Sequence, residues 1–104
     1  MRTTANGIEI EYATYGDPSS PPLLTIHGLG AQMTDFSSDF IEGMVGAGYF
    51  LITFDNRDQG ASTWFDELGE PDFMALLVDP DAPVPYLLSD MAADAAGLLD
   101  ALGI

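Results

Sequence analysis

The chain has 104 residues, 47% of them hydrophobic, and its 17 carboxylates against two basic side chains give a net charge of −15. This length fits a single domain, and the charge repels nucleic acid and anionic membranes, so neither is an expected partner. The sequence contains no cysteine, no run of eighteen apolar residues and no apolar leader. These absences exclude disulfides, thiolate metal ligands and a spanning helix, and they favour a cytoplasmic protein.

The first predicted element is a β-hairpin over residues 1–15. The dipeptide Asn6-Gly7 is typical of a type I′ turn, which joins two antiparallel strands. From Ile8 to Tyr12, apolar residues alternate with acidic ones, as in a strand with one buried side and one solvent-facing side. A turn rich in proline and glycine follows and separates this strand from the next.

The next three elements predict a βαβ unit. A strand over 23–27 is mostly apolar without alternation, which is typical of a central parallel strand buried on both faces. A helix over about 37–47 follows, with Ser37 as its N-cap, and a second apolar strand covers 49–54. Strand, helix and strand in this order imply a parallel pair with a right-handed crossover.

The remaining half of the chain is predicted as a loop over 55–87 and a helix over 88–102. A short helical turn near 73–77 fits within the loop. In the final helix, apolar residues recur at helical spacing, and we expect Asp94 to lie away from this stripe, as do Asp90 and Asp100. The apolar stripe consists of Leu88, Met91, Ala95, Leu98, Leu99 and Leu102.

The sequence His-Gly-Leu-Gly at 27–30 follows the first apolar strand. Backbone N–H groups in such a turn can hold a phosphate or a developing oxyanion. A dinucleotide site is one interpretation, since Asp55 ends the next strand, but Met33 stands where the third glycine of that motif belongs. The helix also begins several residues late for a pyrophosphate. A purely structural turn is the other interpretation.

A second motif favours the oxyanion interpretation. About 25 residues after the turn, the pattern D-x-R-x-x-G-x-S occupies 55–62, and the stretch over 86–104 contains the last predicted helix. Together these features resemble the N-terminal portion of an α/β-hydrolase, in particular its branch of esterases, methylesterases and epoxide hydrolases. The resemblance covers essentially the whole chain. It implies an incomplete α/β fold, made of an antiparallel hairpin, a parallel βαβ unit and the helix that precedes the nucleophile strand.

The resemblance also implies roles for individual residues. The backbone N–H of Leu29 matches one donor of the oxyanion hole. His27 matches the histidine that braces this loop, and Asp55 and Arg57 are expected to pair and hold the second loop in shape. The residues expected to support the two loops are His27, Gly28, Gly30, Asp55, Arg57, Gly60 and Ser62.

No metal or cofactor is expected. The twelve residues over 55–66 have Gly60 in the sixth position, as in an EF-hand loop, but Arg57 occupies the third ligand position and places a cation where Ca²⁺ would bind. Asp79 and Asp81 are expected to lie in a solvated loop.

The catalytic triad of the family has no counterpart in this sequence. The chain has one histidine, and Ser62 lies in no G-x-S-x-G elbow, so we expect Ser62 to be structural. In the family the strand over 23–27 pairs with the nucleophile strand, so here we expect an open sheet edge.

We therefore expect an N-terminal fragment of a serine hydrolase that acts on small-molecule esters and is inactive by itself. The alternative is a non-catalytic binding domain, which pairs through its edge with a complementing C-terminal chain or with a second copy.

Overall fold

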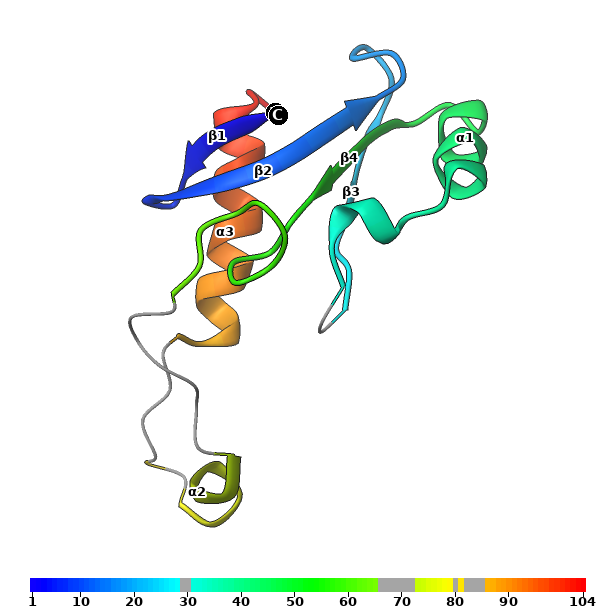
Figure 1. Ribbon diagram of the computed structural model, residues 1–104. Coiled ribbons are helices and arrows are strands. Elements are labelled where there is room, and N and C mark those ends of the chain that lie inside the picture. Colours follow the sequence, from blue (N-terminus) through cyan, green and yellow to red (C-terminus); the bar gives the residue numbers. More distant parts are fainter. Residues whose placement is uncertain (29–30, 66–72, 80, 82–85) are drawn as a thin grey trace.

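The computed structural model describes residues 1–28, 31–65, 73–79, 81 and 86–104. Its elements are drawn in Figure 1. The strands are β1 (Arg2–Ala5), β2 (Ile8–Tyr15), β3 (Pro22–Thr25) and β4 (Phe50–Phe54). The helices are a short 3₁₀ helix (Met33–Asp35), α1 (Ser38–Gly46), α2 (Phe73–Val78) and α3 (Leu88–Ala101).

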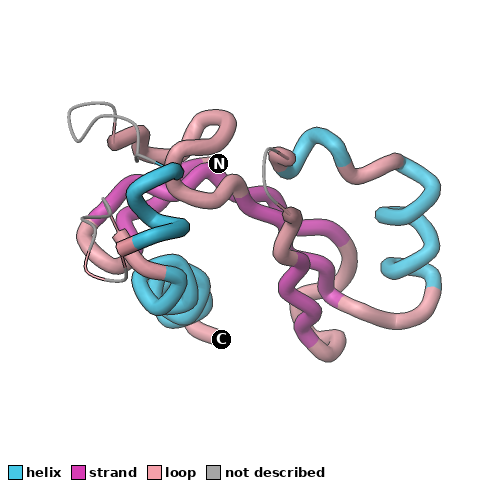
Figure 2. The backbone as a smooth tube through the Cα atoms, turned by 90° about the horizontal axis from the view of Figure 1, so that it is seen from below, coloured by secondary structure: helices cyan, strands magenta, loops and turns pink. Residues whose placement is uncertain are grey.

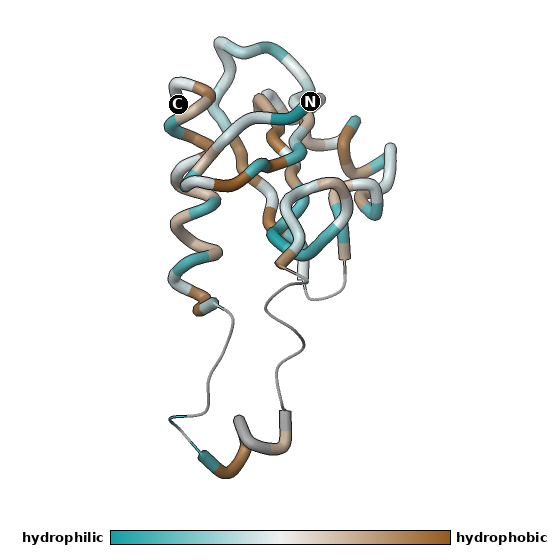
Figure 3. The backbone as a smooth tube through the Cα atoms, turned by 60° about the vertical axis from the view of Figure 1, so that its left-hand side comes forward, coloured by the Kyte–Doolittle hydropathy of each residue, from teal (hydrophilic) through white to brown (hydrophobic). Residues whose placement is uncertain are grey.

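The predicted hairpin is formed by β1 and β2. Asn6 and Gly7 have φ angles of 51° and 78°, which is the pair of left-handed residues that a type I′ turn requires. Hydrophobic and hydrophilic residues alternate along β2 (Figure 3), and Ile10 is fully buried. The alternation directs one face of the hairpin into the core.

The four strands form one sheet in the order β1-β2-β4-β3. β2 is antiparallel to β4, and β3 is parallel to β4, so the predicted βαβ unit is confirmed. β3 lies at the edge of the sheet that the described residues form. It ends at Thr25, two residues before the predicted limit, because the ladder with β4 stops where Thr25 lies opposite Thr53. None of the residues of β3 is buried, and Ile26 is 63% exposed. The prediction that this strand is buried on both faces was wrong, because β3 is an edge strand of the sheet that the described residues form.

Helices lie on both sides of this sheet, as Figure 2 shows for α1 and α3. Ser37 caps α1, as predicted, since its Oγ accepts a hydrogen bond of 3.1 Å from the Phe40 N–H. α3 packs against the hairpin. None of the helices in the described residues has the length and apolar character needed to cross a membrane. The core cluster of buried residues consists of Ala5, Ile10, Ile52, Phe54, Ala95 and Leu98.

The buried face of α3 was predicted only partly correctly from the sequence. Leu98 is fully buried, as expected, but Leu88 at the start of the helix is 81% exposed. Asp94, which was expected to face away from the apolar stripe, is 1% exposed. That prediction was wrong because Asp94 lies three residues after Met91 and four before Leu98, and residues at these spacings share a helix face.

Candidate functional site

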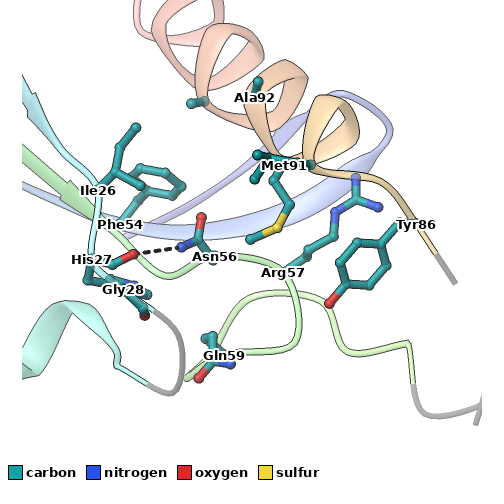
Figure 4. A pocket seen from close by; sticks show the side chains of 12 residues that line it. Ile26, His27, Gly28, Phe54, Asn56, Arg57, Gln59, Tyr86, Met91 and Ala92 are labelled. Atoms are coloured by element: carbon teal, nitrogen blue, oxygen red, sulfur yellow. Dashed lines mark hydrogen bonds between the residues drawn. The ribbon is translucent and has the colours of Figure 1, made fainter. Parts of the chain in front are cut away.

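The candidate site lies where β3 and β4 end. Parallel strands bring their carboxyl ends to the same edge of a sheet, so the loops after β3 and β4 meet there. The Asn56 side chain donates a hydrogen bond of 3.4 Å to the His27 carbonyl oxygen and joins the two loops (Figure 4). Next to this contact is a cavity of about 520 Å³, bounded on its other side by α3. Figure 4 also shows Met91 extending from α3 toward Asn56 and Arg57.

Asp55 connects three segments of the chain. Its backbone N–H donates to the Glu11 carbonyl oxygen in β2 at 3.0 Å. Its carboxylate accepts from the Met33 N–H at 2.7 Å and from the Ala61 N–H at 3.0 Å. The side chain is thus fully engaged with backbone donors, and Asp55 is 3% exposed.

Arg57 pairs with Asp94 rather than with Asp55, so the predicted Arg57–Asp55 pair was wrong. The guanidinium donates two parallel hydrogen bonds to the Asp94 carboxylate, of 2.6 Å from Nε and 2.7 Å from Nη2. Both residues are buried, and these hydrogen bonds raise the pKa of Arg57 above its ordinary value. Asn6 in the hairpin turn donates to the same carboxylate at 2.9 Å. The pair therefore links the second loop, α3 and the hairpin.

Two aromatic rings lie against the Arg57 guanidinium. The ring centroids of Phe65 and Tyr86 are 4.9 Å and 4.8 Å from its central carbon, within the range of cation–π attraction. The Tyr86 hydroxyl donates to the Asp58 carboxylate at 2.5 Å. Asp58 also accepts from the Phe65 N–H at 2.5 Å and has a left-handed φ of 61°. These contacts fix one wall of the cavity.

Comparison with known proteins gives relatives that are longer than this chain. No family model matches the sequence. Rhodomycin D methylesterase DnrP of Streptomyces peucetius is 36% identical over 85 residues, which are 82% of this chain and 24% of that protein. The corresponding methylesterase DauP of Streptomyces sp. (strain C5) is 34% identical over 86 residues. The chain thus spans about a quarter of the length of these curated relatives.

Solved structures match the whole chain. Epoxide hydrolase A from Mycobacterium thermoresistibile superposes with a TM-score of 0.72 and 23% identity, over 99% of this chain and 27% of that one. The enol-lactonase from Burkholderia xenovorans LB400 gives 0.75 and 19%, over 100% of this chain and 34% of its own length. This chain has the fold of the N-terminal part of an α/β-hydrolase. The predicted fold class is confirmed.

Two of the residues predicted for the loop after β3 lie outside the described residues. They are Leu29, the predicted oxyanion donor, and Gly30. His27 lies near two rings, with its own ring centroid 6.4 Å from that of Phe36 and 6.5 Å from that of Phe54. Its Nδ1 is 3.3 Å from the Gly28 carbonyl oxygen, and its buried Nε2 has no hydrogen-bond partner among the described residues.

Ser62 takes part in the structure of the second loop. Its hydroxyl donates to the Asp55 carbonyl oxygen at 2.6 Å and accepts from the Glu11 N–H at 2.9 Å. Ser62 is 3% exposed, and no histidine contacts it among the described residues. The hydroxyl ties β2 to the loop and is not presented to the cavity.

The described residues contain no group of three or more His, Asp or Glu side chains that could hold a metal ion. Asp79 instead accepts a hydrogen bond of 2.9 Å from the Asp81 N–H, which is a local turn contact. The residues that sequence reasoning missed are Asn56, Asp58, Tyr86 and Asp94. The helical spacing of Asp94 was the available signal, and the contacts of the other three depend on the folded path of the loop.

Tyr86 gives the site a measurable pH dependence. Burial, with the hydrogen bond to Asp58 as the second cause, raises the pKa of Tyr86 from 10.0 to about 12. The folded chain holds this proton more tightly than the unfolded chain does. The contribution of protonated Tyr86 to the stability of the folded chain is therefore complete below pH 10, and it is lost as the pH rises through about 12. Phenolate absorbance and urea unfolding should both show this late step, and Tyr86→Phe should remove it. An unchanged alkaline profile in Tyr86→Phe would contradict the assignment.

Proposed function

We propose that this chain serves as the N-terminal part of a serine hydrolase that cleaves esters, and that its loop after β3 supplies one half of the oxyanion hole. The observation that carries the proposal is the joining of the loops after β3 and β4, by Asn56 with His27 and by Asp55 with Met33. The methylesterase relatives support an ester as the substrate class.

In the proposed reaction, a serine hydroxyl passes its proton to a base while its oxygen adds to the ester carbonyl carbon, and the carbonyl oxygen becomes an anion. The Leu29 N–H donates a hydrogen bond to that oxygen and stabilises it more strongly than the neutral carbonyl. Collapse of this intermediate expels the alcohol, which takes up a proton, and leaves an acyl-enzyme that water hydrolyses to the acid. One such donor contributes about 10²–10³ in kcat. The serine, its base and the second donor have no counterpart in this sequence, which has one histidine and no G-x-S-x-G motif.

A hybrid enzyme tests the proposal. Residues of this chain replace the matched 85-residue part of the Streptomyces peucetius methylesterase, and hydrolysis of a methyl ester is measured. We expect an active hybrid in which Leu29→Pro, which removes the N–H, lowers kcat by about 10²–10³, while Leu29→Ala, which keeps it, has a small effect. The 104-residue chain by itself should not turn over p-nitrophenyl acetate.

An inactive hybrid would contradict the proposal, and so would either of two further outcomes. One is equal activity of the Leu29→Pro and Leu29→Ala hybrids. The other is turnover of p-nitrophenyl acetate by the chain alone that Ser62→Ala abolishes, because the chain would then carry its own nucleophile.

A second candidate function is a binding domain that pairs through the edge of β3. It is favoured by the edge position of this strand and by Ile26 and Leu88, which are 63% and 81% exposed beside the cavity. The occupant is a complementing C-terminal chain or a second copy, although a charge of −15 on each copy opposes self-association at low salt. Size-exclusion chromatography with light scattering on the chain alone distinguishes these two occupants, because only pairing between copies yields a dimer. A stable monomer argues against pairing between copies.

A further inference from the structure

We infer that Asp55 is a positioning residue for the loop after β3, and that its carboxylate, acting from the neighbouring loop, sets where that loop lies. This inference rests on the proposed function, because it assigns the placement of the oxyanion loop to a residue that does not touch the substrate. It concerns contacts between described residues and can be tested without any reaction.

The backbone of Asp55 is fixed before its side chain is considered. Its N–H donates to the Glu11 carbonyl oxygen at 3.0 Å, and its own carbonyl oxygen accepts from the Ser62 hydroxyl at 2.6 Å. Glu11 belongs to β2, and Ser62 is itself tied to β2, because its hydroxyl accepts from the Glu11 N–H at 2.9 Å. The carboxylate therefore projects from a rigid base, as a positioning group must.

From this base, the two carboxylate oxygens reach two different loops. Oδ1 accepts from the Met33 N–H at 2.7 Å, and Oδ2 accepts from the Ala61 N–H at 3.0 Å. Asp55 takes part in none of the ion pairs among the described residues, since the nearby arginine is bonded to Asp94. The buried carboxylate is thus stabilised by backbone N–H groups, and hydrogen bonds to an ionised acceptor are stronger than neutral ones.

Asn56, the residue after Asp55, holds the other end of the loop after β3. Asn56 donates to the His27 carbonyl oxygen at 3.4 Å, while Asp55 holds Met33. A turn contact of 3.2 Å from the Ala31 N–H to the Gly28 carbonyl oxygen lies between these two points. Leu29 lies between them in the sequence. The two residues after β4 therefore determine both ends of the segment that carries the proposed oxyanion donor.

Amide hydrogen exchange by NMR on the 104-residue chain tests the inference. Asp55→Asn keeps the shape of the side chain but leaves one acceptor oxygen for two N–H groups. We expect exchange at Met33 to accelerate at least about tenfold more than exchange at Ile52 in the core of β4, because the loop opens locally. Ser62→Ala is the matched control. It removes a bond to the Asp55 backbone and leaves the carboxylate in place, so Met33 and Ile52 should accelerate by the same factor.

Equal acceleration of Met33 and Ile52 in Asp55→Asn would overturn the inference, since Asp55 would then act on global stability. If Asp55→Asn does not fold, the wild-type chain still gives a result. A scalar coupling from the Met33 amide nitrogen to the Asp55 carboxyl carbon is expected, and its absence would overturn the inference. Neither measurement needs substrate, so a positive result here together with inactive hybrids would reject the proposed function and retain the positioning role.

Discussion

Replacing Arg57 by alanine is expected to destabilise the folded chain by about 3–5 kcal/mol, because it leaves the Asp94 carboxylate buried without its cation. Asp94 is 1% exposed, and Arg57 is its partner in a bidentate pair of 2.6 Å and 2.7 Å. The loss is a large share of the total stability of about 5–15 kcal/mol that is typical of small domains. Urea denaturation followed by circular dichroism measures it as a lower midpoint.

Arg2, the other basic residue of the chain, is a matched control. Its side chain is 51% exposed and lies 3.6 Å from Glu11. An exposed ion pair of this kind contributes about 0–1 kcal/mol, so Arg2→Ala should change the free energy of unfolding little. The double variant Arg57→Met with Asp94→Leu should lose less stability than Arg57→Ala, because it removes both buried charges together. Similar midpoints for Arg57→Ala and Arg2→Ala would refute the prediction.

The sequence predicted well those elements that depend on local pattern. The type I′ turn follows from Asn6 and Gly7, which accept a left-handed backbone with little strain. The start of α1 follows from Ser37, whose hydroxyl caps the helix in the structure. The parallel pairing of β3 with β4 follows from the two uninterrupted apolar segments, although only β4 is largely buried. Each of these features depends on a few neighbouring residues.

The partners across the site depend on packing and were not predictable in the same way. The resemblance to the α/β-hydrolase family implied a pair of Arg57 with Asp55, but the Asp55 carboxylate is already bonded to backbone N–H groups. The partner of Arg57 is Asp94, which lies 37 residues away and reaches it once α3 packs on the hairpin. The predicted pair was wrong because a buried carboxylate that accepts two N–H groups does not need a cation.

Gly60→Ala is expected to destabilise the chain by about 3 kcal/mol or more. A Cβ at position 60 would lie 2.2 Å from the Oδ2 atom and 2.8 Å from the Oδ1 atom of Asp55. The carboxylate would have to move, and each buried N–H group left without its acceptor costs about 1–3 kcal/mol. The left-handed φ of 49° at Gly60 adds about 1–2 kcal/mol for any residue with a Cβ. Urea unfolding measures the sum.

Gly48→Ala separates the two contributions. Gly48 has a φ of 97°, but a Cβ there meets no atom within 4 Å, so the variant bears the backbone strain without the collision. Gly60→Ala should therefore be about 2 kcal/mol or more worse than Gly48→Ala. An equal loss in the two variants would mean that the Asp55 carboxylate moves freely. A carboxylate that moves freely cannot hold the Met33 N–H in place, so this comparison also bears on how the loop after β3 is positioned.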